Sequence, residues 1–266
     1  MTLAEITEIS GQAGDFKVRI RRSPRYVDVD KCIACGLCAE KCPKKVIDTY
    51  NEKLVQRKAI YVPYSQAVPL KYTIDAENCI YFTKGKCRAC EKFCPSGAIN
   101  FDDRAEDTII SVGAVVAAPG FRSFDPGGSD VYAYDRSPDV VTSIEFERIL
   151  SATGPYGGHL LRPSGKKEEK QPQKIAWIQC VGSRDINRCG NDYCSAVCCM
   201  YAVKQALIAK DHSHIPLDCA VFYMDMRTQG KDFDRYYEKA RQTGVRFVRS
   251  RIHSISPVDD CDDLLL

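Results

Sequence analysis

The segment 32–43, CIACGLCAEKCP, decides how the central part of this chain folds. It holds four cysteines, and a proline follows the last of them directly. A second group lies downstream, where Cys79 is followed by the segment 87–95, CRACEKFCP. Together the two groups place eight of the chain's fifteen cysteines between residues 25 and 104. Because this stretch shows little helical periodicity, the sequence predicts that bound metal, rather than a large apolar core, organises it.

The spacing within these groups is that of bacterial ferredoxins. Gaps of two, two and three residues before a Cys-Pro are typical of a pair of [4Fe–4S] clusters. Three thiolates on one tight loop reach three irons of a cluster, and the proline diverts the fourth cysteine to the other cluster. The spacing therefore predicts crossed ligation. Cluster 1 takes Cys32, Cys35, Cys38 and Cys94, and cluster 2 takes Cys79, Cys87, Cys90 and Cys42.

The second group departs from the standard pattern, because seven residues rather than two separate Cys79 from Cys87. We expect residues 80–86 to loop out between these two ligands. The alternative is a pair of zinc sites, since cysteines two residues apart also bind zinc. Zinc needs four ligands and explains neither the third cysteine of each run nor the trailing Cys-Pro. The spacing thus favours iron–sulfur clusters.

Composition narrows the class of protein further. The chain has 266 residues, of which 44% are hydrophobic and 27% charged, with a formal net charge of +3. That length suffices for one large domain or two modest ones. No basic stripe with interleaved aromatic residues points to a nucleic-acid partner. No apolar run approaches the ~20 residues of a transmembrane segment, and the start MTLAEITEIS has no apolar signal core. We expect a cytoplasmic protein whose clustered cysteines bind metal rather than form disulfides.

Periodic patterns predict the elements outside the cysteine-rich segment. Residues 3–9 and 16–20 are expected to form two strands with a turn between them. Residues 112–118 are expected to form a strand of small side chains. Residues 142–145 form a capping box that predicts a helix through Leu150.

The last hundred residues alternate between strand and helix after a polar stretch at 162–173, which we interpret as a surface linker. Strand, helix, strand, helix, strand implies a parallel sheet with right-handed crossovers, half of a Rossmann-type unit. The predicted strands are 174–180, 219–224 and 245–248, and the predicted helices are 195–210 and 233–242.

Five further cysteines lie within twenty residues of one another, around the first turn of this unit: Cys180, Cys189, Cys194, Cys198 and Cys199. A Rossmann turn carries glycines that hold a pyrophosphate, but the chain has no G-x-G-x-x-G. The same turn, with its N–H groups and a helix N-terminus, suits an anionic thiolate-ligated cluster. The alternative is that these are small buried hydrophobes in a packed helix, because their spacing matches no common ferredoxin motif.

Several stretches resemble the A subunit of heterodisulfide reductase: PRYVDVDKCIACGLCAEKCP at 24–43, KAIYVPYSQAVPLKYTID at 58–75, TSIEFERILSATGP at 142–155, IQCVGSRD at 178–185 and YCSAVCCMYAVKQALIAK at 193–210. The resemblance covers nearly the whole chain. Members are FAD-containing iron–sulfur flavoproteins with a thioredoxin-reductase-like fold and an inserted ferredoxin domain. They pass electrons between ferredoxin, hydrogenase or dehydrogenase modules and a disulfide-reducing or quinone-linked partner.

The resemblance implies an α/β protein with a partial thioredoxin-reductase-like flavoprotein fold. Its parts would be flavoprotein strands at 1–24, an inserted 2[4Fe–4S] ferredoxin-like domain at 25–104, the flavoprotein remainder at 105–165 and a Rossmann-like βαβαβ unit at 174–266. The resemblance also implies a third [4Fe–4S] cluster near the flavin. Its ligands would be Cys180, Cys194, Cys198 and Cys199, whereas Cys189 occupies a one-residue insertion and is left out.

Two features depart from the family. Relatives begin with a strand and a glycine-rich turn that grip the FAD pyrophosphate, and this chain shows neither, so we expect a truncated product or one half of a split subunit. The family's Ala-Thr-Gly reads Ala118-Pro119-Gly120 here, and the proline removes a hydroxyl and a backbone donor. We therefore expect Ala118 and Gly120 to line an FAD site only with a partner chain.

The function that follows is an iron–sulfur electron-transfer subunit of a heterodisulfide-reductase-like oxidoreductase. It would relay electrons between the ferredoxin-type clusters and a flavin region. Its expected partners are other heterodisulfide-reductase-like subunits and electron-donor proteins. The alternative is a non-catalytic iron–sulfur relay or assembly module that never binds flavin.

Overall fold

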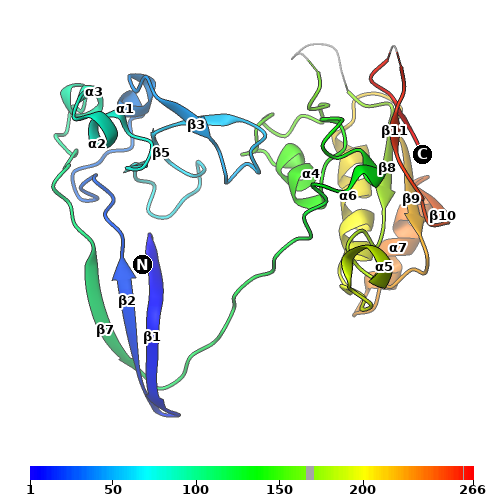
Figure 1. Ribbon diagram of the computed structural model, residues 1–266, viewed down its shortest axis with the longest axis horizontal. Helices are drawn as coiled ribbons and strands as arrows, with labels where there is room; N and C mark the ends of the chain where they lie inside the picture. The colour runs from blue at the N-terminus through cyan, green and yellow to red at the C-terminus, as the bar shows by residue number, and fades with distance from the viewer. Residues whose placement is uncertain (166–170, 260) are drawn as a thin grey trace. The chain divides into compact units, whose positions relative to one another are not determined.

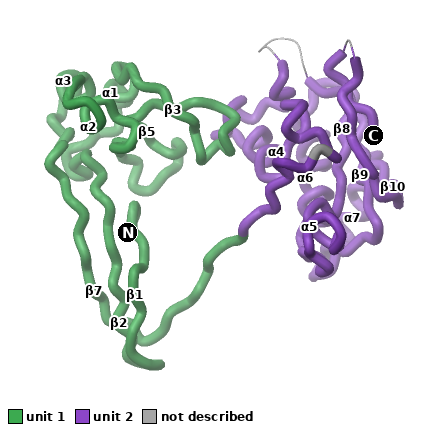
Figure 2. Tube along the Cα trace, viewed as in Figure 1, with its two compact units in different colours: residues 1–121 green, residues 122–266 purple. Residues whose placement is uncertain are grey.

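The computed structural model describes residues 1–165, 171–259 and 261–266 (Figure 1). Residues 166–170, which belong to the predicted linker, lie outside this description. The chain is mixed α/β and divides into two compact units, residues 1–121 and residues 122–266 (Figure 2).

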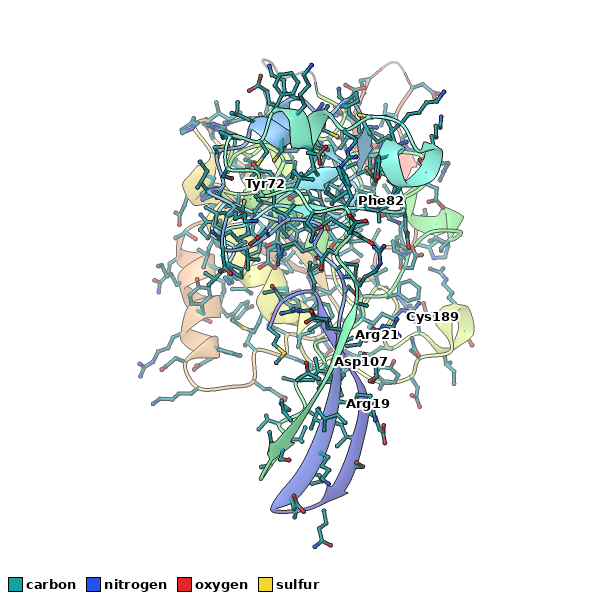
Figure 3. All side chains as sticks on the ribbon, turned by 90° about the vertical axis from the view of Figure 1, so that its left-hand side faces the viewer. Arg19, Arg21, Tyr72, Phe82, Asp107 and Cys189 are labelled. Carbon is teal, nitrogen blue, oxygen red and sulfur yellow. The ribbon has the colours of Figure 1, made fainter. Side chains whose placement is uncertain are left out.

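Unit 1 contains a three-stranded antiparallel sheet in the order β1-β2-β7. The predicted hairpin is confirmed, and a third strand joins the free edge of its second arm. Figure 3 shows Arg19 and Arg21 on β2 and Asp107 on β7, in the part of the sheet that extends away from the cysteine-rich segment. The side chains of β1 are all exposed, and Arg19 pairs across the strands with Glu8 at 3.2 Å. The strands are β1 (Ala4–Gln12), β2 (Asp15–Arg22) and β7 (Glu106–Val112).

The predicted strand at 112–118 is wrong. The strand in this region runs from Glu106 to Val112, and the chain has no regular structure beyond it as far as residue 120. The reason is the length of its neighbour: β2 begins at Asp15, its Phe16 pairs with Val112, and the last backbone bond between the two segments runs from the Gly14 N–H to the Gly113 carbonyl at 2.9 Å. Apolar character alone does not create a strand here, since the Val116 side chain is 90% exposed.

Between β2 and β7 the chain folds into short elements joined by turns. β3 pairs with β4, and β5 pairs with β6, both antiparallel. The two ends of this segment meet, because Val27 bridges to Ile99 and the Asp103 carboxylate accepts the N–H groups of Arg25 and Tyr26 at 2.8 and 3.0 Å. The elements are α1 (Leu37–Glu40), β3 (Lys45–Ile47), β4 (Gln56–Lys58), β5 (Ile60–Tyr61), β6 (Thr73–Ile74), α2 (Ile80–Lys84) and α3 (Ala89–Lys92).

The core of this segment is small and includes cysteine. Cys32 and Cys38 are buried together with the apolar side chains Val27, Ile60, Ile74, Ala98 and Phe101. Aromatic rings pack against this core, with ring centroids 4.4 Å apart for Tyr26 and Phe82 and 4.1 Å apart for Tyr81 and Phe101. Cysteines thus occupy places that a larger domain would fill with aliphatic side chains.

Unit 2 is built on a parallel sheet in the order β10-β9-β8. The predicted alternation of strand and helix is confirmed, with ends that differ by a few residues. The elements are a 3₁₀ turn (Asp130–Tyr132), α4 (Ser143–Leu150), β8 (Lys174–Ile178), α5 (Ile186–Cys189), α6 (Cys198–His212), β9 (Asp218–Tyr223), α7 (Phe233–Gln242), β10 (Arg246–Arg249), β11 (Ser256–Pro257) and β12 (Leu264–Leu265).

The core of unit 2 lies between α6 and the sheet. Val203 and Ala206 on α6, and Cys219 and Val221 on β9, are fully buried. The predicted capping box is also confirmed: the Thr142 hydroxyl accepts the N–H of Glu145, whose carboxylate accepts the N–H of Thr142. This apolar interior holds the strand ends and the start of α6 in place. Among the described residues, no helix is both long and apolar enough to cross a membrane.

Candidate metal centres

The eight cysteines of unit 1 stand around two small hollows. Each hollow draws three cysteines from one motif and the fourth from the other. The structure therefore brings together both sets that the spacing groups, and metal ligation by them stays a prediction. Cys32, Cys35, Cys38 and Cys94 line the first hollow, and Cys42, Cys79, Cys87 and Cys90 line the second.

Left-handed residues turn the backbone around these hollows. Ala34 and Gly36 have φ of 57° and 88°, on either side of Cys35, and Cys87 itself has φ of 75°. Such conformations are uncommon outside glycine and concentrate where a site demands them. The segment 80–86 does loop out between Cys79 and Cys87, as the short helix α2 with a left-handed glycine at its end.

Burial and repulsion from neighbouring thiols raise the pKa of two thiols of unit 1, Cys38 and Cys90. Burial, reinforced by the neighbouring Cys32, Cys35 and Cys94, raises the pKa of Cys38 to about 11. Burial raises the pKa of Cys90 to about 12, with further contributions from Cys79 and Cys42. Holding such a set as thiolates at neutral pH requires a bound cation, which is what metal ligation supplies.

The pKa of Cys94 is shifted the other way. Burial opposes its ionisation, but the N–H of Ala98, 3.3 Å from its sulfur, and the Ser96 hydroxyl at 3.6 Å lower its pKa. Hydrogen bonds to ligand sulfur also tune the potential of a cluster. Sequence spacing did not point to Ser96 or to Tyr72, which line the first hollow beside the cysteines.

In unit 2, three of the five clustered cysteines are in contact. The Cys198 thiol interacts with those of Cys180 and Cys199. These interactions lower the pKa of Cys198 and raise the pKa of its two partners. The three sulfurs lie where β8 ends and α6 begins, and this donor set fits a thiolate-ligated cluster.

The two remaining cysteines behave differently from each other. Cys194 interacts with Cys199 and with the Arg227 side chain, and its sulfur accepts the N–H of Ala196 at 3.3 Å. Cys189 ends α5 (Figure 3) and donates to its own helix, at the Asp185 carbonyl 3.0 Å away. The thiol of Cys189 thus has its hydrogen-bond partner within its own helix and takes no part in the contacts that join the other cysteines of this group.

The turn that follows β8 is tightly constrained. Cys180, Gly182 and Arg184 all have positive φ, of 62°, 73° and 55°. A Cβ at Gly182 would lie 2.1 Å from the ring of Phe124, so only glycine fits there. The turn thereby presents Cys180 and Arg184 at the carboxyl edge of the parallel sheet, where ligands of such sheets bind.

Ala118 and Gly120 lie in the exposed irregular segment that follows β7. An added Cβ at Gly120, whose φ is 74°, would meet no atom within 4 Å. Neither residue lines either cysteine-lined hollow. By themselves they form no cradle for FAD.

Among the described residues, no three His, Cys, Asp or Glu side chains converge closely enough to hold a single metal ion.

Comparison with known proteins agrees with this arrangement. The family model of the 4Fe-4S dicluster domain matches residues 31–98, which include all eight cysteines around the two hollows. The domain that carries these cysteines is thus a 4Fe-4S dicluster domain.

Curated relatives match nearly the whole chain. It is 43% identical to the iron-sulfur A subunit of CoB–CoM heterodisulfide reductase from Methanocaldococcus jannaschii, over 94% of this chain and 37% of that protein. It is 47% identical to the second of two such proteins from Methanopyrus kandleri over the same shares. It is 36% identical to the A subunit of the Ferredoxin/F(420)H(2)-dependent CoB–CoM heterodisulfide reductase from Methanosarcina acetivorans, over 97% of this chain and 32% of that protein. The chain spans about a third of the length of these relatives. Along nearly all of its residues, the chain is a homologue of the iron-sulfur A subunit of heterodisulfide reductase.

Proposed function

We propose that this chain is the iron–sulfur electron-transfer part of a heterodisulfide-reductase-like oxidoreductase. The observation that carries the proposal is the interleaving of two cysteine motifs around two hollows within the dicluster domain. A [4Fe–4S] cluster bound in such a site takes up and releases single electrons. The chain would contribute eight thiolates, one of which, Cys94, accepts a backbone hydrogen bond, and the apolar side chains packed beside them.

The placement of the two sets suits a relay. Cys38 of the first set interacts with Cys90 of the second, so the two sites are neighbours. Cys35 and Cys87 are exposed, one in each set. Each site thus has an inner edge toward the other and an outer edge at the surface, where a partner protein can exchange an electron.

Unit 2 is proposed to hold a third cluster on Cys180, Cys194, Cys198 and Cys199. Three of these thiols are already in contact at the carboxyl edge of the sheet, and the N-terminus of α6 favours negative charge there. We further propose that the chain contributes to a thioredoxin-reductase-like flavoprotein in the cytoplasm. Ala118 and Gly120 would line an FAD site completed by another polypeptide, and the partners would be further subunits and electron-donor proteins.

Cysteine exchange tests crossed ligation. In reconstituted protein, Cys42→Ser should alter the EPR signal of the cluster held by Cys79, Cys87 and Cys90. Cys94→Ser should alter the other signal. If each substitution instead damages the cluster of its own sequence motif, the pairing proposed from the two hollows is wrong.

The competing function is a relay or assembly module that never binds flavin. Its clusters would look the same, so the cofactor that separates the two is FAD. Flavin absorbance that appears when the chain is purified with its partner subunits supports the oxidoreductase. Iron–sulfur absorbance without flavin in that complex supports the relay.

A further inference from the structure

An ion-pair group lies beside the cysteines of unit 2. Asp225, in the loop after β9, pairs with Arg227 through the Nε atom at 3.0 Å and also with Arg184 through its Nη1 atom. Arg184 belongs to the turn after Cys180, so the group joins the loops that follow two neighbouring strands, β8 and β9. One carboxylate therefore orients two guanidinium groups at the same edge of the sheet.

Both arginines also reach the sulfur atoms. The backbone N–H of Arg227 donates to Cys199 at 3.4 Å, and its guanidinium interacts with the Cys194 thiol. Arg184 interacts electrostatically with Cys180. Two of the four thiols proposed to ligate the third cluster, Cys194 and Cys180, thus interact with a guanidinium of this group, and Cys199 accepts a backbone N–H from it.

An ordinary surface ion pair is the simpler explanation, because such pairs are common and contribute little to stability. It does not account for Arg227, which contacts Asp225 and two different cysteines at once. It also does not account for the position, since Arg184 stands in a left-handed conformation that only a constrained turn maintains.

The physical consequence concerns charge. Reduction of a cluster adds one negative charge, and a cation held nearby stabilises the reduced form more than the oxidised form. We propose that Arg227, oriented by Asp225 and assisted by Arg184, is a positioning residue that raises the reduction potential of the third cluster. This role rests on the proposed function, since it requires a cluster on these cysteines.

The test is a redox titration of the full chain, reconstituted anaerobically and followed by EPR. Arg227→Gln removes the charge and should shift the equilibrium toward the oxidised form at least about tenfold, which is about 59 mV for a one-electron couple. Arg227→Lys keeps the charge and should retain most of the potential. Arg235→Gln is the matched control, because Arg235 is 83% exposed and pairs with Asp232 on the surface. It should leave the potential unchanged.

A second variant separates orientation from simple charge. Asp225→Asn removes a negative charge, which by itself would raise the potential, but it also releases both arginines, which would lower it. A lowered potential supports the positioning role, and it does so even where Arg227→Gln loses iron. An unchanged potential in Arg227→Gln with full iron content, or a raised potential in Asp225→Asn, overturns the proposal. If the wild-type protein binds only about eight irons per chain, the third cluster does not form, and the role proposed for Arg227 is excluded before any variant is measured.

Discussion

Cysteines that are close in sequence differ sharply in their surroundings. Cys198 interacts with two other thiols, whereas the Cys189 thiol donates to the Asp185 carbonyl at the start of α5. A ligand thiolate holds the local fold through the metal, and a thiol bonded to its own helix does not. Proximity in sequence is therefore a poor guide to which cysteines form the site.

This difference predicts the effect of removing each thiol. Cys194→Ala, Cys198→Ala or Cys199→Ala should each remove the third cluster, about four irons per chain, and loosen the start of α6. Cys189→Ala is the control and should keep the full iron content. Iron analysis and circular dichroism of the reconstituted variants measure both effects. A loss of iron in Cys189→Ala equal to that in the other variants would place Cys189 among the ligands.

The residues around the sulfur atoms were less predictable than the sulfur atoms themselves. Cysteine spacing grouped the thiols because ferredoxin loops are short and proline fixes their exit. Arg227 and Asp225 follow a later strand, and only the parallel sheet brings them to Cys199 and Cys194. The available signal was their place after a strand of a Rossmann-type unit, where ligand-binding loops gather.

At the scale of elements, short-range sequence patterns predict the features that depend only on neighbouring residues. The capping box at Thr142, the β1–β2 hairpin and the alternation of unit 2 all follow from short-range patterns. The end of β7 does not, because it depends on where β2 begins. Strand boundaries set by a neighbour in space are invisible to a pattern read along the chain.

The turn between β8 and α5 gives a prediction at this scale. Gly182→Ala places a Cβ against the Phe124 ring in addition to the strain of its φ of 73°. Gly190→Ala is the matched control, since its φ of 71° imposes similar strain but an added Cβ meets nothing within 4 Å. We expect Gly182→Ala to lower the free energy of unfolding by about 1–3 kcal/mol more than the control. Chemical denaturation measures both variants.

A double variant tests whether contact with the Phe124 ring causes this difference. Phe124→Ala in the Gly182→Ala background should recover much of the difference between the two glycine variants, because it removes the ring that the new Cβ meets. Equal destabilisation by Gly182→Ala and Gly190→Ala would show that backbone strain alone, rather than Phe124, selects glycine in this turn.

For the whole molecule, the flavin is the cofactor that this chain alone supports least. Ala118 and Gly120 are exposed, and among the described residues no atom lies within 4 Å of a Cβ added at Gly120. Tight cofactor sites bury most of the ligand surface. We predict that the purified chain is brown from its clusters and releases little FAD on denaturation, as measured by fluorescence of the supernatant. Near one FAD per chain would mean that other residues hold the flavin.

The most direct test of the central claim, that this chain is an iron–sulfur electron carrier, is its content of iron and acid-labile sulfide after anaerobic reconstitution. Two clusters in unit 1 and one in unit 2 predict about twelve irons and twelve sulfides per chain. About eight irons and eight sulfides would show that the two clusters of the dicluster domain form and that the third does not. Bound zinc without acid-labile sulfide, in a colourless protein, would contradict the claim itself.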